Sequence, residues 1–367
     1  MRRLLFTLHL VVGIGAGLLL TLTGLTGSLL VFRHELDAAL NPELLRVPAR
    51  GEPAPVGRAV EAAVRAVPGA RVQHLFVAPA PGAAHEVWLQ GTERRVYVDP
   101  YTARVLGTRD ERRSVMGRLF ALHTKLLGGE SRERVVGFGG LALLFLSASG
   151  LVLWWPSRLR QLPDRLRVKW GASAKRVNYD LHRSVGFWAA GLLALTALTG
   201  SSLVFSEWFT AAAYRLTRTH EPPKVRVNAP PDGGAGAPLP LDALLRRADA
   251  ALPGGDLRRV SFPAKPDAPL VIRKRLPGDL HPNGMSYVYL DPYTGDVLRA
   301  DAAGDAVAGR RLLNLRYPLH IGRWGGLATR VLYVLLGLLP GLLFVTGCRM
   351  WWNRAGAKRR RNPPVVG

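Results

Sequence analysis

The chain contains 367 residues and carries a net charge of +24, with a single cysteine, Cys348. One cysteine excludes an internal disulfide, a cysteine-rich zinc site and a Cys-x-x-Cys-His haem attachment, and we expect Cys348 to pack in the interior. The charge would suit nucleic-acid binding, but no basic motif with interleaved aromatic residues and no zinc-finger spacing accompanies it. We therefore expect no nucleic acid among the partners.

Four long apolar segments predict membrane-spanning helices. They are Leu4–Phe32, Val135–Trp155, Val185–Phe209 and Val331–Trp352. Each has about 20 apolar residues, which is enough to cross the hydrocarbon core of a bilayer. The first is too long for a cleaved signal peptide and lacks a small-x-small cleavage signature. The chain is predicted to be a polytopic membrane protein.

Clusters of Lys and Arg beside these segments indicate which ends stay in the cytoplasm. They lie before the first helix, in the segment 158–180 and after the last helix, at Arg2, Arg3, Arg158, Arg160, Arg165, Arg167, Lys169, Lys175, Arg176, Arg354, Lys358, Arg359, Arg360 and Arg361. Short flanks rich in these residues remain cytoplasmic, whereas long loops are exempt from the rule. We expect both termini and the 158–180 loop in the cytoplasm, and the two long loops on the opposite side.

Each long loop is predicted to hold a soluble module. The first combines a helix near Val56–Val67 with strands that end at 96–102, and the second a helix near Leu241–Leu252 with strands that end at 288–294. Both end in Asp-Pro-Tyr-Thr, which suits a tight turn between two strands. The segment Glu221–Pro240, rich in Pro and Gly, is expected to be a flexible linker.

The predicted fold class is a membrane all-α four-helix bundle with two small α+β modules. The expected order is a first spanning helix (1–35), a first module (36–113), an interfacial segment with the second helix (114–157), a cytoplasmic loop (158–180), the third helix (181–210), a linker with the second module (211–310), an interfacial segment with the fourth helix (311–353) and a basic cytoplasmic tail (354–367).

The sequence indicates an internal duplication. His9 aligns with His182 and the segment 26–32 with 199–205, both at an offset of 173 (182 − 9; 199 − 26). His123 aligns with His320, and 154–155 with 351–352, both at an offset of 197 (320 − 123; 351 − 154). Because both halves start in the cytoplasm, the repeats are parallel and an axis along the membrane normal would relate them. Equivalent residues would then face each other at the same depth.

The two histidine pairs are the candidate cofactor site. His9 and His182 lie near the cytoplasmic surface, and His123 and His320 near the opposite surface. Haem iron with two axial imidazoles has the same two-fold arrangement, and facing helices of bundles commonly build such sites. Zinc is a weaker alternative, because carboxylate partners are few.

His34 is a fifth candidate, since it follows His9 by 25 residues (34 − 9). In one continuous helix it would lie on nearly the same face, about 37 Å away. Its counterpart in the second half is Glu207, so it could be a ligand, a substrate-side group or neither. A lone histidine at a helix end is more often an interfacial or capping residue, and we expect the remaining histidines at the surface: His74, His85, His220 and His281.

Other residues have simpler interpretations. Small residues such as Gly24 and Gly200 are expected to let helices approach closely, and they could also leave room for a flat macrocycle. Pro340 should kink the fourth helix. Arg183 could neutralise a haem propionate or be one more cytoplasmic charge. No nucleophile–base constellation, phosphate-binding loop or dinucleotide fingerprint is found, so any redox chemistry would belong to a cofactor.

Several motifs together resemble one family. They are Leu-His at 8–9 and 122–123, Thr-Gly-Ser-Leu-Leu-Val-Phe-Arg-His-Glu-Leu-Asp at 26–37, Gly-Leu-Val-Leu-Trp-Trp-Pro at 150–156 and both Asp-Pro-Tyr-Thr turns. The chain is similar to the PepSY-associated transmembrane-helix family over nearly its whole length. The resemblance implies an iron-regulated protein of the bacterial inner membrane with two PepSY-like periplasmic modules. Some members are haem-containing reductases that release iron from ferric siderophores.

The resemblance implies that the membrane histidines His9, His34, His123, His182 and His320 are axial ligands of haem iron. Our leading hypothesis is a dihaem b-type oxidoreductase that moves electrons from a quinol or a cytoplasmic reductase to a ferric siderophore or similar chelate. His9 with His182 would hold the inner haem, and His123 with His320 the outer one, with His34 nearby. The alternatives are a non-catalytic, membrane-tethered PepSY protein that binds or regulates a periplasmic protease or partner, and an accessory subunit of siderophore uptake.

Overall fold

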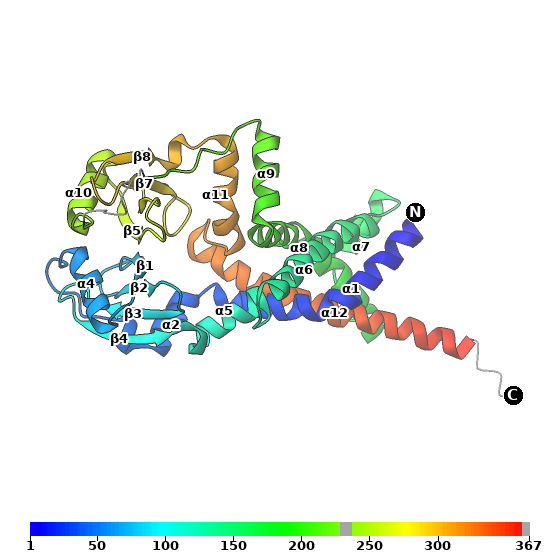
Figure 1. Cartoon of the computed structure of the whole chain (residues 1–367). Helices are drawn as coiled ribbons and strands as arrows, with labels where there is room; N and C mark the ends of the chain where they lie inside the picture. Colours follow the sequence, from blue (N-terminus) through cyan, green and yellow to red (C-terminus); the bar gives the residue numbers. More distant parts are fainter. Residues whose placement is uncertain (228–236, 362–367) are drawn as a thin grey trace. The chain divides into compact units, whose positions relative to one another are not determined.

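The structure is a computed structural model that describes residues 1–227 and 237–361. The chain forms two compact units (Figure 1). The membrane unit comprises residues 1–32, 119–209 and those from 319 onward, and the sheet unit comprises 33–118 and 210–318. Part of the predicted linker, 228–236, and the end of the predicted basic tail, 362–367, lie outside the described residues.

The membrane unit contains the four predicted apolar helices, so the chain is a membrane protein. They are α1 (Arg2–Leu30), α6 (Glu130–Trp154), α8 (Ala174–Val204) and α12 (Gly326–Arg361). The helix α8 begins well before the apolar run, because the Ser173 side chain caps it by accepting from the N–H of Arg176. It also ends earlier than predicted, and a separate helix, α9 (Ser206–Thr217), follows. The helix α12 continues through Pro340.

The spanning helices pack in a cyclic order. The helix α1 packs most extensively against α12, and α6 against α8, while α1 with α6 and α8 with α12 complete the cycle. Therefore α1 and α8 lie diagonally across the bundle. Small residues bring the helices close: a Cβ added at Gly24 or Gly337 would clash with the backbone carbonyl of the other.

Shorter helices join the spanning helices to their neighbours. The helices α5 (Val115–Lys125) and α11 (Ala308–His320) precede α6 and α12 and end beside His123 and His320. The loop between α6 and α8 contains the 3₁₀ helix η2 (Leu159–Gln161) and α7 (Leu162–Leu166).

The helix that carries His34 is not a continuation of α1. A turn at residues 31–32 separates α1 from α2 (Arg33–Leu40), so the prediction that His9 and His34 share one helix is wrong. Ion pairs hold α2 in the sheet unit: Asp37 binds Arg109 at 2.7 Å, and Arg33 lies 3.6 Å from Glu111. His34 therefore belongs to the sheet unit.

The sheet unit contains one antiparallel sheet of eight strands, in the order β4-β3-β2-β1-β5-β6-β7-β8. The strands are β1 (Val72–Phe76), β2 (His85–Leu89), β3 (Arg94–Val98), β4 (Val105–Asp110), β5 (Asp256–Ser261), β6 (Leu270–Arg275), β7 (Ser286–Leu290) and β8 (Val297–Asp301). The sequence predicted two separate modules, but β1 pairs with β5, with Leu75 opposite Val260, and joins all the strands into one sheet. The short helices of this unit are α3 (Pro42–Leu45), η1 (Glu111–Arg113) and η3 (Ala303–Asp305).

The core of the sheet unit lies between one face of the sheet and two helices, α4 (Val56–Ala66) and α10 (Leu241–Ala251). Both helices were predicted to within a residue at each end. Alternate strand residues such as Val87, Val96 and Val288 are fully buried in this core. The two Asp-Pro-Tyr-Thr turns are confirmed, because Asp99 and Asp291 each accept two backbone N–H groups of the turn that follows.

Candidate functional site

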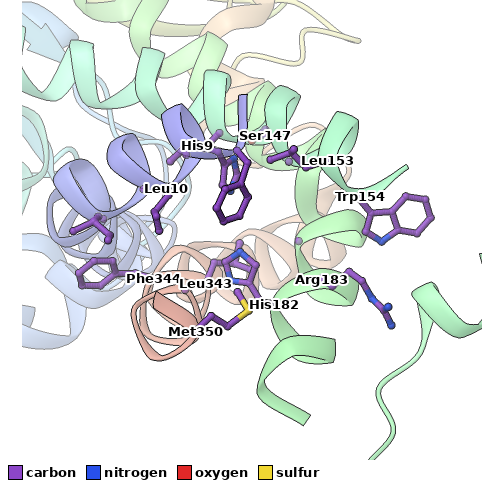
Figure 2. A pocket seen from close by; sticks show the side chains of 18 of the residues that line it. His9, Leu10, Ser147, Leu153, Trp154, His182, Arg183, Leu343, Phe344 and Met350 are labelled. Carbon is purple, nitrogen blue, oxygen red and sulfur yellow. The ribbon is translucent and has the colours of Figure 1, made fainter. Parts of the chain in front are cut away.

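A cavity of about 790 Å³ lies inside the membrane unit, with walls from all four spanning helices. Its lining is mostly apolar, with residues such as Leu143 and Phe344. His9 from α1 and His182 from α8 enter it from opposite walls (Figure 2). Since α1 and α8 lie diagonally in the bundle, the two imidazoles face each other across the space that the four helices enclose. The sequence predicted this pairing from the repeat.

Each of these two imidazoles is held by a hydroxyl from the neighbouring spanning helix of its own half. His9 Nδ1 lies 2.8 Å from Ser149 Oγ on α6, and His182 Nδ1 lies 2.9 Å from Thr346 Oγ1 on α12. The residue after each hydroxyl is a glycine, and a Cβ added there would lie 3.5 Å or 3.3 Å from the Cε1 atom of the ring. The imidazole therefore packs directly on helix backbone.

The hydroxyl contacts favour one tautomer of both rings. Ser149 Oγ lies 2.7 Å from the carbonyl oxygen of Phe145, and Thr346 Oγ1 lies 2.7 Å from that of Leu342, and each hydroxyl can donate its only hydrogen there. With these bonds made, each hydroxyl oxygen accepts from the imidazole and Nδ1 carries the ring proton. Nε2 then keeps a free lone pair, which is the state in which a neutral imidazole binds a metal.

The second predicted pair is built in the same way. His123 Nδ1 lies 3.0 Å from Thr26 Oγ1 on α1, and His320 Nδ1 lies 3.3 Å from Thr199 Oγ1 on α8. Both threonines donate to carbonyls of their own helix, at Leu22 and at Leu195. Gly27 and Gly200, the next residues, again lie against the rings.

The rings of His123 and His320 lie with their centroids 6.3 Å apart, at an interplanar angle of 47°. Two imidazoles that bind one metal from opposite sides, with metal–nitrogen bonds of about 2 Å, have their centroids about 6 Å apart once the ring radii are added. The spacing of this pair therefore matches that of two axial ligands of one iron.

The two pairs lie at well separated depths. On α1, His9 and the Thr26 that holds His123 are 17 residues apart (26 − 9), and on α8, His182 and Thr199 are also 17 apart (199 − 182). At 1.5 Å per residue this is about 26 Å along each helix. The arrangement thus places one imidazole pair towards each end of the spanning helices.

Arginine side chains gather at the end of the cavity that lies near His9 and His182. They are Arg2, Arg3, Arg165, Arg183 and Arg354. No Asp or Glu lines the described cavity. Arg183 is already paired, because it donates to Asp180 at 2.8 Å and to the Asp164 carbonyl at 2.6 Å. An apolar space with facing imidazoles and a basic rim fits a flat macrocycle that carries carboxylates.

Zinc fits these residues less well than haem. Among the described residues, no group of three or more His, Cys, Asp or Glu side chains is placed to hold a metal ion. A zinc site needs three or four protein ligands, whereas haem iron needs two axial ligands because the macrocycle supplies the others.

The remaining five histidines all belong to the sheet unit. His34 lies in the sheet unit, and its role as a ligand stays a prediction. The expectation that His85 and His281 lie at the surface is wrong: they are 3% and 8% exposed. His85 is on an inward-facing position of β2, where it accepts from the N–H of Ala78, and burial lowers its pKa to about 4.

The hydroxyl partners were not recognised as site residues from the sequence. A signal was present: the dipeptide Ser-Gly or Thr-Gly recurs at 26–27, 149–150, 199–200 and 346–347, with the offsets of the histidines, 173 (199 − 26) and 197 (346 − 149). For the small residues of the membrane helices the sequence predicts close packing, with room for a macrocycle as a second interpretation, and this prediction does not include hydrogen bonds between their hydroxyls and the imidazoles.

One family model matches nearly the whole chain. It is described as the PepSY-associated TM region and covers residues 6–354, which include every histidine and hydroxyl residue of the two pairs. No curated protein matches the chain.

Proposed function

Because the chain belongs to the PepSY-associated TM region family, we propose that it is a membrane oxidoreductase with two b-type haems that passes electrons to a ferric chelate. The observation that carries this proposal is the repeated arrangement of the imidazoles. Two histidine pairs, about 26 Å apart along the helices, each present imidazoles whose Nδ1 atoms contact hydroxyls, which leaves Nε2 to bind a metal.

Each pair would hold one haem. His9 and His182 would hold one haem in the cavity of about 790 Å³, where Arg2, Arg165 and Arg354 supply positive charge for the propionates. His123 and His320 would be the ligands of the second haem. Haem supplies reversible one-electron chemistry when it is bound, and its potential depends on the axial ligands and their hydrogen bonds.

The hydroxyls, the cavity walls and the separation of the two sites each have a task in this function. The hydroxyls of Ser149, Thr346, Thr26 and Thr199 hold the ring protons and orient the imidazoles. The apolar walls of the cavity exclude water, which keeps the local dielectric low. Two sites at different depths give electrons a route along the bundle, so that a donor on one side of the membrane can serve an acceptor on the other.

The proposed location is the bacterial inner membrane, with both termini and the 158–180 loop in the cytoplasm. The Lys and Arg residues of the short flanks support this orientation. The sheet unit would then face the periplasm as two PepSY-like modules joined through β1 and β5. The matched offsets of histidines and hydroxyl partners support an origin by duplication. The electron donor would be a quinol or a cytoplasmic reductase, and the acceptor a ferric siderophore or similar chelate.

Optical spectroscopy of the purified full-length protein tests the proposal. We expect a Soret band, α bands that sharpen on reduction with dithionite, and two haems per chain in a pyridine haemochrome assay. The variants His9→Ala and His320→Ala should each lose about one haem, because each removes one axial ligand. The control His220→Ala replaces an exposed histidine outside both pairs and should keep two. A protein expressed with ample haem that shows no Soret band would overturn the proposal.

A further inference from the structure

Arginine side chains gather on the sheet unit around Tyr287. We call Arg259 on β5, Arg273 on β6 and Arg310 on α11 the arginine face. The guanidinium carbons of Arg273 and Arg310 lie 5.4 Å and 5.8 Å from the centroid of the Tyr287 ring. Except for Arg273, which is 8% exposed, these side chains are partly open to solvent.

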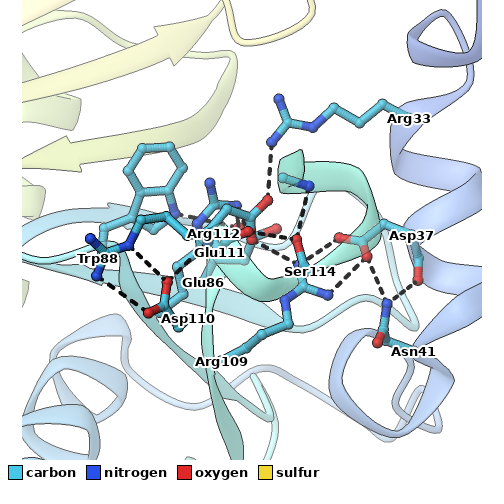
Figure 3. A network of polar contacts seen from close by, with 12 residues as sticks. Arg33, Asp37, Asn41, Glu86, Trp88, Arg109, Asp110, Glu111, Arg112 and Ser114 are labelled. Atoms are coloured by element: carbon cyan, nitrogen blue, oxygen red, sulfur yellow. Dashed lines mark hydrogen bonds and ion pairs between the residues drawn. The ribbon is translucent and has the colours of Figure 1, made fainter. Parts of the chain in front are cut away.

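The same face of the sheet is electrically balanced in the first half. Arg95 lies 3.3 Å from Glu86 and 3.4 Å from Glu111, and Arg109 lies 3.0 Å from Glu111 and 2.7 Å from Asp37 (Figure 3). Every arginine of this network therefore has a carboxylate partner, as buried charges generally require.

Strand register shows what replaces these carboxylates in the second half. Val87 pairs with Val96 between β2 and β3, and Ile272 pairs with Val288 between β6 and β7. In this register Val271 takes the place of Glu86, and Arg273 the place of Trp88. Two carboxylate positions of the first half are thus apolar in the second, since Ala303 stands where Glu111 does (303 − 111 = 288 − 96).

Among the residues that the structure describes, no carboxylate forms an ion pair with the arginine face. Within the described ranges, Arg259, Arg273 and Arg310 form no ion pair, although their neighbour Arg299 pairs with Asp301 at 3.0 Å. Arg273 donates instead to the Gly284 carbonyl at 2.8 Å.

The side chains around Arg273 do not neutralise its positive charge. Burial lowers the pKa of Arg273, and the positive charge of Arg259 lowers it further, while Tyr287 opposes the shift. The carboxylate that raises it, Asp279, already accepts the backbone N–H groups of Leu276 at 2.9 Å and Met285 at 3.2 Å. Partly buried cations without an anionic partner are costly, so a bound anion would stabilise this region.

We propose that the arginine face is a binding site for a small polyanion, a ligand with several carboxylate or phosphate oxygens. Arg259 and Arg310 are both partly exposed and can present their N–H groups to such oxygens in bidentate fashion. Buried Arg273 and the Tyr287 ring form the floor between them. The anion site does not depend on haem. The further inference that it binds the substrate rests on the proposed function. In that case the protein would prefer an anionic ferric chelate to a neutral or cationic one.

Calorimetric titration of the purified full-length protein with iron-free citrate tests the site. We expect saturable binding that weakens as salt is added, because the contacts are ionic. The double variant Arg259→Gln/Arg310→Gln should bind citrate at least about tenfold more weakly, since each loses charged hydrogen bonds. The control Arg299→Gln removes an arginine of the same sheet that is already neutralised by Asp301, and it should bind citrate like the unmodified protein.

Equal citrate affinity in the double variant and the unmodified protein would overturn the proposal. So would a protein that binds no citrate but binds phosphatidylglycerol in nanodiscs through these arginines, because the anion would then be a lipid headgroup. Citrate binding is measured without iron or reduction. A protein with two haems and no citrate binding therefore contradicts only the anion site, and a haem-free protein that binds citrate contradicts only the proposed function.

Discussion

A hydroxyl group holds each of the four membrane histidines by the same ring nitrogen. Ser149 and Thr346 do so for His9 and His182. In each case the hydroxyl also lies within hydrogen-bond distance of a helix carbonyl, and when it donates there the imidazole donates to the hydroxyl oxygen. These contacts set the ring orientation and the basicity of Nε2, which are the properties that matter to a metal.

Removing one of these hydroxyls should alter the haem of the proposed function without removing its histidine ligand. In Ser149→Ala, His9 loses the acceptor for its Nδ1 proton, so Nε2 becomes less basic. We expect a more positive midpoint potential for one haem and about 10- to 100-fold weaker haem retention at that site. Spectroelectrochemical titration and haem transfer to apomyoglobin measure the two effects.

Ser147→Ala is the matched control for this change. Ser147 lines the same cavity on the same helix, but its hydroxyl forms no hydrogen bond among the described residues. The midpoint potential and the haem retention of Ser147→Ala should equal those of the unmodified protein. If the two variants behave alike, the hydroxyl of Ser149 has no positioning role.

At the scale of elements, the bundle depends on close approach between helices α1 and α12. The backbones of Gly24 and Gly337 touch, and Ser28 on α1 donates to the Val334 carbonyl on α12 at 2.8 Å. Without a hydrophobic driving force between helices in lipid, such contacts supply much of the packing energy. Both helices also line the cavity, so their separation affects its shape.

A larger side chain at this contact should destabilise the membrane unit. In Gly337→Val the new side chain would meet Ser28 Oγ and the Gly24 carbonyl, and overpacking of this kind costs about 1–3 kcal/mol. Gly191→Val on α8 is the control, because a Cβ there meets nothing within 4 Å. Thermal unfolding in detergent, followed by fluorescence, should show a lower midpoint for the first variant alone. Equal midpoints would mean that the α1–α12 contact contributes little.

The sequence predicted elements better than it predicted their partners. The spanning helices follow from apolar length, and α4 and α10 from periodicity, because both signals are local. The pairing of β1 with β5 could not be predicted, because it joins two edge strands that are far apart in the sequence and neither strand has a sequence pattern that specifies its partner. The burial of His281 against Arg273 and Tyr317 was missed for the same reason, since residues from three different elements meet there.

The candidate site, too, was predictable only in part. The facing of His9 and His182 was predictable, because a repeat implies an axis and an axis implies opposed residues. The contact of each ring with a particular hydroxyl depends on helix rotation, which the apolar pattern of a spanning helix does not specify. His34 was misplaced because a two-residue turn after α1 interrupts an otherwise helical pattern.

For the whole molecule, the basic flanks predict which face of the membrane each loop occupies. Cysteine labelling can test this once Cys348 is replaced by serine. We expect a membrane-impermeant maleimide to label Arg104→Cys, in the turn between β3 and β4, in intact spheroplasts. Gly171→Cys, in the loop between α6 and α8, should react only after lysis. Both positions are exposed, so a difference in labelling reports sidedness. Labelling of Gly171→Cys in intact spheroplasts would reverse the proposed orientation.

Each membrane histidine contacts a hydroxyl from its own half of the chain, which bears on how such a protein could arise. His9 and His123 are held by Ser149 and Thr26 of the first half, and His182 and His320 by Thr346 and Thr199 of the second. One half therefore contains one oriented imidazole for each depth and completes neither pair. Two copies of such a half, meeting as a symmetric dimer, would form both pairs at once. In this chain the connection between α6 and α8 holds the two halves together. If the halves arose by the proposed duplication, each could change its soluble surface separately, and the balanced and arginine-rich faces of the sheet differ in that way.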